Sequence, residues 1–423
     1  MTSRNTLAAA AAAACLLGAQ AQAQPLPTAA PDSVGFSAER LKNIDAFFAS
    51  EIERKRVPGA VVAIARQGKL VYFKAFGQAD PVKGTPMSTD TIFQLASMTK
   101  IQAAVGALAL TEQGRLPLQG KLADHFPAFG TMQVGVPTPD GKFKLEPQTR
   151  PILVHDLFRH TAGMTYGGRP DGSSPIAALW PSGGAAQIMG TATQMVDNLT
   201  KLPLVYQPGT VYEYSLSFDV LGAVVEKVTG KTLGGHLADT VWKPLKMSDS
   251  TFRPSEAQMA RVARPFPLNP LNGRPQSIAA LQRPATFDCG GACAFGTMGD
   301  YIRFGQMLVN GGSLDGAQVL SPASVRMMTS DHLGTAIQNN VANVEPHRAG
   351  YGFGLGVAVR MQAGVAAVPG SPGEFSWNGA NGTGFFADPK EQLVVAFGTA
   401  APGDLRKYYR EQVQDLVYGA MSR

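Results

Sequence analysis

A serine and a lysine stand three positions apart in the segment TIFQLASMTK, at Ser97 and Lys100. A serine hydroxyl is a weak nucleophile at neutral pH and needs a neighbouring base to take its proton. Residues three positions apart on a helix share one face, so the two side chains can meet. A buried lysine can lose its proton, because burial disfavours the charged form. The pair could therefore attack an acyl group, with Ser97 as the nucleophile and Lys100 as its proton partner.

The same spacing also fits an ordinary helix start with a solvated lysine. This is, however, the only Ser-x-x-Lys in the sequence, and it follows a strand-like TIFQL and precedes an apolar helix. In the first helical turn the backbone N–H of Ser97 would be free to bind an oxyanion. No Gly-x-Ser-x-Gly occurs as a rival nucleophile motif. The histidines lack metal-ligand spacing, and His155 and His160 are interpreted as structural.

Strand patterns that could position this pair lie near both ends of the chain. AVVAIARQGKLVYFKAFG predicts a hairpin turned at Gln67-Gly68, and GTGFFADPKEQLVVAFG predicts another turned at Asp388-Pro389-Lys390. YGFGLGVAVR predicts one further strand, and DLRKYYREQVQDLVYGAM is apolar at the helical period. We expect the hairpins to pair in one antiparallel sheet that helices flank.

The middle of the chain is predicted to be mostly helical. MTKIQAAVGALALTEQG ends at Gly114, DVLGAVVEKVTG ends at Gly230, and TMGDYIRFGQMLVNGG begins after Thr297 and ends at Gly311. The first of these helices carries an apolar stripe of Met98, Ile101, Val105 and Leu108. We expect a cleft between the helical lobe and the sheet, lined in part by the loops 167–184 and 265–272.

The first residues are typical of an export signal. Arg4 precedes a short alanine-rich apolar stretch, and the AQA at residues 21–23 is a small-residue cleavage site. A disordered alanine-rich N-terminus is the alternative. The sequence therefore predicts a signal peptide at 1–23, a mature chain of 24–423 and a periplasmic or secreted location. The stretch is too short to span a bilayer, so no stable membrane anchor is expected.

The charge and the cysteines exclude some classes of partner and cofactor. The net charge is +6, but the basic residues are scattered, without the basic stripe that a nucleic-acid partner would need. Cys289 and Cys293 lie in FDCGGACAFG, where the intervening glycines allow a tight disulfide. Two buried free thiols are an equally good interpretation. A metal site is not expected, because no histidine stands close enough to complete a ligand set.

Four segments together resemble a known superfamily. They are FQLASMTK, LFRHTAGMTYG, VYEYSLSFDVLGAVVEKVTG and EFSWNGANGTGFFADPKEQLVVAF. From about Gly35 to the C-terminus the chain resembles the serine β-lactamase and penicillin-binding-protein superfamily, and within it the class C-like carboxylesterases often called family VIII. The resemblance implies an α/β (α+β) fold with an antiparallel sheet flanked by helices. Its α/β lobe would comprise residues 35–96 and 345–423, and a mostly helical lobe residues 97–344, in a single catalytic domain.

The resemblance also implies roles for individual residues. Ser97 would be the nucleophile, Lys100 its proton partner and Tyr214 a second base in the loop before a helix. A phenol titrates near pH ~10, so Tyr214 would act as a base only beside a cation; the sequence leaves open whether Lys100 is that cation or is itself the base. The backbone N–H groups of Ser97 and Ala380 would bind the oxyanion. No cofactor and no metal are implied.

Three departures from the β-lactamase pattern bear on the substrate. Leu216 stands where a β-lactamase would have Asn, Trp377 where it would have Lys, and Asn378 where it would have Thr. With Gly379, these residues are predicted to contact the substrate. Burying a substrate carboxylate without a cationic partner is costly, so the changes favour an uncharged small-molecule ester. Trp377 could instead be a packing residue.

The function predicted on this basis is hydrolysis of carboxylic esters through an acyl-enzyme on Ser97. One alternative is a β-lactamase or a D-Ala carboxypeptidase-like amidase. A second alternative is a non-catalytic penicillin-binding-like module, although the presence of Ser97, Lys100 and Tyr214 argues against it.

Overall fold

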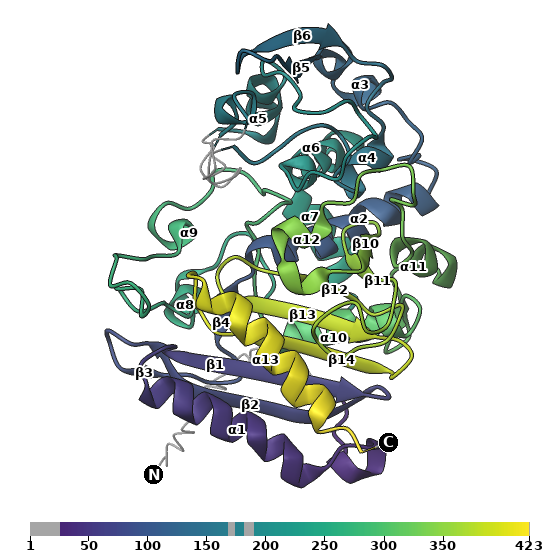
Figure 1. The fold of residues 1–423 in the computed structure, drawn as a ribbon. Helices are drawn as coiled ribbons and strands as arrows, with labels where there is room; N and C mark the ends of the chain where they lie inside the picture. The colour runs from purple at the N-terminus through teal and green to yellow at the C-terminus, as the bar shows by residue number, and fades with distance from the viewer. Residues whose placement is uncertain (1–25, 168–173, 182–189, 423) are drawn as a thin grey trace, which may run out of the picture.

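The fold is that of a computed structural model, which describes residues 26–167, 174–181 and 190–422 (Figure 1). The predicted signal peptide, residues 1–23, lies outside the described residues. So do residues 168–173 and 182–184 of the loop that was expected to line a cleft.

Both ends of the chain contribute to one antiparallel sheet of eight strands, in the order β10-β11-β12-β13-β14-β1-β2-β3. The strands are β1 (Gly59–Arg66), β2 (Lys69–Asp80), β3 (Thr85–Pro86), β10 (Tyr351–Phe353), β11 (Ala358–Arg360), β12 (Phe375–Asn378), β13 (Thr383–Asp388) and β14 (Leu393–Gly398). The β1–β2 hairpin turns at Gln67 and Gly68, whose φ angles are 54° and 75°. β14 pairs with β1, with Val61 opposite Gly398. The predicted pairing of the two terminal hairpins is therefore confirmed.

The prediction of a single strand in YGFGLGVAVR is wrong, because this segment forms the two strands β10 and β11. Tyr351 lies opposite Arg360 in an antiparallel pair. The chain reverses where the N–H of Gly354 donates to the carbonyl of Val357 at 2.8 Å. Gly356 in this turn has a φ of 91°, which glycine adopts without steric cost. The glycines allow the chain to reverse here, although the apolar pattern of the segment continues through the turn.

Helices cover both faces of the sheet, as predicted. α1 (Ala38–Glu53) and α13 (Leu405–Gly419) lie side by side on one face, and α10 (Met298–Val309) packs against β1 and β14 on the other (Figure 1). All eight residues of β1 are buried. A strand covered on both faces is apolar throughout, which explains why the β1 sequence does not alternate between apolar and polar residues.

The middle of the chain packs around α2 (Thr99–Glu112). α6 (Ser217–Thr229), α7 (Leu233–Leu237) and the π-helical turn η6 (Ala238–Trp242) contact α2, and α4 (Val154–Phe158) and α5 (Ala192–Leu199) pack against α6. The residues of the predicted apolar stripe are buried, and so is every other residue from Thr99 to Leu110, so the helix is covered on all sides. Small residues allow the neighbours to close in on all sides: a Cβ on Gly106 would lie 2.5 Å from the Leu237 side chain.

The helix ends follow the glycines. Gly114, Gly230 and Gly311 have φ angles of 69°, 71° and 75° at the ends of α2, α6 and α10, as predicted. The hydroxyl of Thr297 caps α10 by accepting from the N–H of Asp300 at 3.0 Å. The remaining elements are η1 (Pro31–Val34), β4 (Ile92–Gln94), η2 (Ala96–Met98), α3 (Leu122–His125), η3 (Pro127–Gly130), β5 (Gln133–Pro137), β6 (Phe143–Pro147), η4 (Ala177–Leu179), α8 (Glu256–Ala260), α9 (Ala279–Gln282), β7 (Phe295–Thr297), β8 (Ser313–Leu314), β9 (Ala317–Gln318), α11 (Pro322–Met328), α12 (Val341–Val344) and η7 (Pro346–Arg348).

Cys289 and Cys293 form a disulfide, with their Cα atoms 5.3 Å apart. Of the two interpretations of these cysteines, the structure thus contains the disulfide and not the pair of free thiols. Across the described ranges, no helix is both long and apolar enough to cross a membrane. The same ranges hold no group of three or more His, Cys, Asp or Glu side chains arranged to bind a metal ion.

Candidate active site

Ser97 lies in the turn η2, between the short strand β4 and the central helix α2. It is partly exposed, whereas the other residues from Thr91 to Lys100 are buried. The residue before it, Ala96, has a φ of 47°, a left-handed conformation that is unfavourable for a residue with a Cβ. Backbone strain of this kind is concentrated at functional sites. The turn therefore presents the serine hydroxyl at the surface of an otherwise closed core.

The side chain of Lys100 is fully buried and points at three oxygen atoms. Its Nζ lies 3.4 Å from Ser97 Oγ, 3.1 Å from the hydroxyl of Tyr166 and 2.6 Å from the carbonyl oxygen of Gly291. An ammonium group could donate to all three oxygens. A neutral amine could donate to two of them and accept the proton of the serine. Both charge states of Lys100 are compatible with these contacts, and in each the amine reaches Ser97.

Tyr214 brings a phenol to the same amine from the loop before α6. The Nζ of Lys100 lies 4.7 Å from the centre of the Tyr214 ring. The Tyr214 hydroxyl accepts a hydrogen bond from the indole Nε1 of Trp377 at 3.2 Å, and the two rings lie 5.1 Å apart. The fold thus brings Tyr214, which is distant in the sequence, to the amine that also reaches Ser97.

Two backbone N–H groups near Ser97 are available to an oxyanion. Within the described residues, neither the N–H of Ser97 nor that of Ala380 has a hydrogen-bond partner. The β12–β13 turn that carries Ala380 packs directly on the chain before the serine. A Cβ on Gly379 would lie 2.3 Å from the carbonyl oxygen of Leu95, and the Thr383 hydroxyl donates to that oxygen at 3.0 Å. The absence of a side chain at Gly379 allows this close approach.

The residues predicted to contact the substrate are mostly covered. Leu216 has no exposed surface, and Trp377 and Asn378 are 2% and 8% exposed. The Asn378 amide donates to Glu345 at 2.7 Å, so it is directed into the protein. Leu216 is therefore part of the core, and Trp377 contacts the Tyr214 hydroxyl directly. The substrate contacts of these residues stay predictions.

A buried charge cluster behind Trp377 was not predicted from the sequence. Glu345 forms an ion pair with Arg410 and lies 3.5 Å from a guanidinium nitrogen of Arg348. The Arg348 guanidinium lies 4.4 Å from the centre of the Trp377 ring, and Arg410 donates to the Gly379 carbonyl at 2.5 Å. Burial would raise the pKa of Glu345, but the two guanidinium groups hold it at about 2. No local signal could have revealed this cluster, because Arg410 and Trp377 are distant in the chain from the segment that carries Glu345 and Arg348.

Tyr166 and Asp219 also adjoin Lys100 and were missed. Burial, together with the Asp219 charge, raises the pKa of Tyr166 well above its usual value, so its hydroxyl stays protonated. Burial raises the pKa of Asp219 to about 6, although the nearby charge of Lys100 lowers it in part. Tyr166 lies within the segment LFRHTAGMTYG, one of the four that carry the family resemblance, and this position was the sequence feature that could have pointed to it. Asp219 lies in the first turn of α6, where an acidic residue is ordinary.

A hollow of about 430 Å³ opens elsewhere, next to the β2–β3 turn. Asp80, Lys83, Arg264 and Ile278 are among its lining residues, and none of the predicted site residues lines it. Of the loop 265–272, which was expected to line the catalytic cleft, Pro265 contributes to this hollow.

Comparison with known proteins identifies the family to which the chain belongs. A family model described as Beta-lactamase matches residues 44–417. The chain belongs to the beta-lactamase family. The predicted superfamily membership is therefore confirmed, and with it the antiparallel sheet flanked by helices.

Esterases are among the relatives within this family. The chain is 30% identical to Esterase EstB of Burkholderia gladioli over 390 residues, which cover 88% of this chain and 93% of EstB. It is 30% identical to Lovastatin esterase of Penicillium rubens over 404 residues, which cover 89% of this chain and 98% of that esterase. The solved structure of EstCE1, a hydrolase with promiscuous acyltransferase activity, superposes on this chain with a TM-score of 0.71 at 26% sequence identity. The superposition covers 90% of this chain and 98% of EstCE1. The chain thus belongs to a serine hydrolase family of the β-lactamase fold that has esterases among its members.

Proposed function

We propose that this protein is a serine carboxylesterase that forms an acyl-enzyme on Ser97. The observation that carries the proposal is the convergence of three groups: the Lys100 amine lies 3.4 Å from Ser97 Oγ and 4.7 Å from the centre of the Tyr214 ring. A nucleophile within reach of a basic unit is the arrangement that acyl transfer requires. The two named esterases, each aligned over most of its length, support the choice of substrate class.

The proposed reaction has two steps. Ser97 Oγ attacks the ester carbonyl while the Lys100/Tyr214 unit takes the hydroxyl proton. The oxyanion binds the N–H groups of Ser97 and Ala380, and the same unit returns the proton to the leaving alkoxide. Water then attacks the acyl-enzyme and releases the acid. An alcohol in place of water would yield a new ester. The step needs no metal and no cofactor.

The surroundings of Trp377 favour an ester without a carboxylate. An indole occupies the position at which the related β-lactamase pattern has a lysine. Two cations lie behind it, but Arg348 and Arg410 both interact with Glu345. Both guanidinium groups are buried, with Arg348 1% and Arg410 6% exposed, so a carboxylate that approached Trp377 would lose its hydration without reaching either cation, whereas an uncharged ester makes apolar contact with the ring.

We also propose that the protein is exported to the periplasm or secreted. The segment at residues 1–23 supports this, as does the Cys289–Cys293 disulfide, since disulfides persist in oxidising compartments. Edman sequencing of the protein purified from its native host should give Gln24 as the first residue. Retention of Met1 would refute the proposal.

Labelling with a fluorophosphonate tests the catalytic proposal. Mass spectrometry of the labelled protein should place the phosphonate on Ser97, and S97A should neither label nor hydrolyse p-nitrophenyl butyrate. S88A serves as the control, since it removes an exposed hydroxyl from the loop before β4, and it should behave as the wild type. If S97A keeps its esterase activity, the acyl-enzyme proposal is wrong.

A substrate panel separates esters from amides of the β-lactam type. The wild type should hydrolyse short p-nitrophenyl esters faster than a chromogenic cephalosporin, judged by kcat/KM. Faster turnover of the cephalosporin would establish the β-lactamase alternative. Absence of both hydrolysis and labelling would favour the non-catalytic module.

A further inference from the structure

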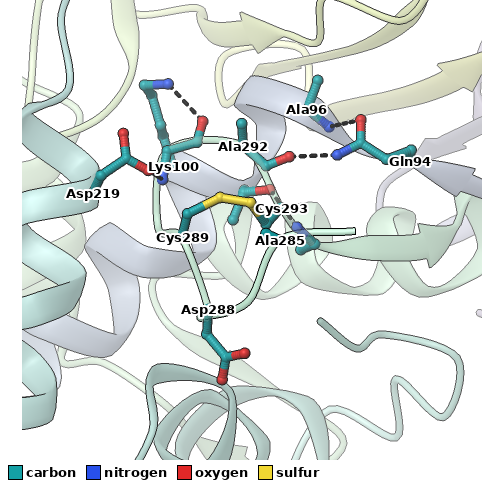
Figure 2. The surroundings of a disulfide bond; sticks show 12 residues. Gln94, Ala96, Lys100, Asp219, Ala285, Asp288, Cys289, Ala292 and Cys293 are labelled. Atoms are coloured by element: carbon teal, nitrogen blue, oxygen red, sulfur yellow. Dashed lines mark hydrogen bonds between the residues drawn. A yellow bond between two sulfur atoms is a disulfide. The ribbon is translucent and has the colours of Figure 1, made fainter. Parts of the chain in front are cut away.

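The loop between Cys289 and Cys293 lies directly against Lys100 (Figure 2). The shortest of the three contacts of the Lys100 Nζ is its hydrogen bond to the Gly291 carbonyl in this loop, at 2.6 Å. The contacts to Tyr166 and Ser97 are longer, at 3.1 and 3.4 Å. The carbonyl of Gly291 is therefore the main anchor of the amine that faces the nucleophile.

Three further interactions fix this loop. The disulfide closes it at its base. Asp219, at the start of α6, accepts the N–H of Gly291 at 2.9 Å. Gln94, in β4, donates its amide to the carbonyl of Ala292 at 2.5 Å and accepts the N–H of Ala96 at 3.1 Å (Figure 2). The loop is thus tied to the turn that holds Ser97 and to the helix that follows Tyr214.

The glycines of the loop allow it to approach α6 closely. A Cβ on Gly291 would lie 2.4 Å and 2.6 Å from the carboxylate oxygens of Asp219, and a Cβ on Gly290 would lie 2.4 Å from the carbonyl oxygen of Phe218. Real Cβ atoms do not come so near to other heavy atoms, because the two would overlap. The sequence CGGAC therefore brings the Gly291 peptide into contact with Asp219 on one side and Lys100 on the other.

We propose that the Cys289–Cys293 disulfide and Asp219 are positioning elements for Lys100. They hold the Gly291 carbonyl so that the amine stays within reach of Ser97. Neither touches the substrate: both act through the Gly291 peptide. The inference rests on the proposed function, because it assigns a consequence for catalysis to the position of Lys100. Besides Asp219, the titratable groups that face Lys100 are Tyr166, Tyr214 and His160, and all three remain in place in the variants below.

The test compares two independent ways of releasing Gly291. The double variant C289A/C293A removes the covalent closure, and D219A removes the acceptor of the Gly291 N–H. Each should lower kcat for p-nitrophenyl butyrate by about tenfold to a hundredfold, because displacements of about 1 Å cost such factors, with KM within about twofold of the wild type. D219N should recover most of the activity lost in D219A, since its amide oxygen can still accept the Gly291 N–H.

D300N is the matched control for the loss of a buried carboxylate. Asp300 resembles Asp219 in having one buried oxygen without a partner in the described chain, but its hydrogen bonds go to Asp249 and Ser250. D300N should change stability and leave kcat unchanged. Rates are divided by the fraction of protein that a fluorophosphonate labels at completion, so that poorly folded protein does not count as a catalytic defect.

The outcomes distinguish this inference from the proposed function. If C289A/C293A and D219A keep kcat within about twofold of the wild type while S97A and K100M are inactive, the positioning role is wrong and the proposed function stands. If D219N falls as far as D219A, the charge of Asp219 matters and not its hydrogen bond, and the inference fails for this residue. If S97A is active, the proposed function fails and the inference fails with it.

Discussion

The hydrogen bond between Trp377 and Tyr214 gives the sharpest prediction about the candidate site. Its donor is the indole Nε1, 3.2 Å from the phenolic oxygen. W377F removes this donor and keeps an aromatic ring against Tyr214 and Phe353, whose rings lie 5.1 and 5.3 Å from the indole. A net hydrogen bond is worth about 0.5–1.5 kcal/mol, so kcat should fall by about twofold to thirteenfold if the bond orients the phenol for proton transfer.

The assay is steady-state hydrolysis of p-nitrophenyl butyrate, with unfolding in urea measured in parallel. W242F is the matched control. Trp242 is also buried, at 6% exposure, and its Nε1 donates to Gln102 at 2.9 Å, which makes the chemical change the same. Both variants should lose about 1–3 kcal/mol of unfolding free energy, but only W377F should lose kcat. An unchanged kcat in W377F, or an equal loss in W242F, would refute the role of this hydrogen bond.

Three further predictions concern stability. E345Q should lower the free energy of urea unfolding by about 3–5 kcal/mol, since it leaves Arg348 and Arg410 as uncompensated buried charges; a loss no larger than that of an exposed ion pair would contradict this. Burial raises the pKa of Glu374 from 4.5 to about 7, so the folded state holds a proton that the unfolded state has released. The contribution of Glu374 to the free energy of unfolding is therefore fully present below pH 4.5 and is lost as the pH rises through 7. E374Q should therefore flatten the decline of the urea midpoint between pH 5 and pH 7, and parallel profiles of the two proteins would count against it. G230A should cost about 1–2 kcal/mol, because Gly230 ends α6 with a φ of 71° and a Cβ there would contact nothing within 4 Å; kcat should not change, and a loss of activity would show that the site depends on this helix end.

Predictions from the sequence succeeded where structure is local. The turns at Gln67-Gly68 and after Asp388 and the helix end at Gly230 depend on backbone conformations that neighbouring residues determine. The spacing of Ser97 and Lys100 is equally local, because residues three apart on a helix must share a face. These features were visible in short segments and appear in the structure where they were expected.

Predictions failed where packing decides the outcome. The predicted apolar stripe of α2 is buried, but the sequence did not indicate that the rest of the helix is covered as well, a close packing that its alanines and glycine allow. The two strands in YGFGLGVAVR were read as one, because the apolar pattern continues through the turn. In both cases the apolar residues were recognised in the sequence, but the segments that pack against them could not be predicted from it.

By itself the sequence determined the chemistry that is available: a serine and a lysine on one helical turn, a tyrosine before another helix, and two cysteines that glycines separate. The tertiary structure alone decided which groups meet. It brought Tyr166 and Gly291 to Lys100, linked Trp377 to Tyr214, and enclosed Glu345 with two arginines. The physical reason is that periodicity and turn preference act over a few residues, whereas these contacts join segments whose distance is set by the packing of whole helices and strands.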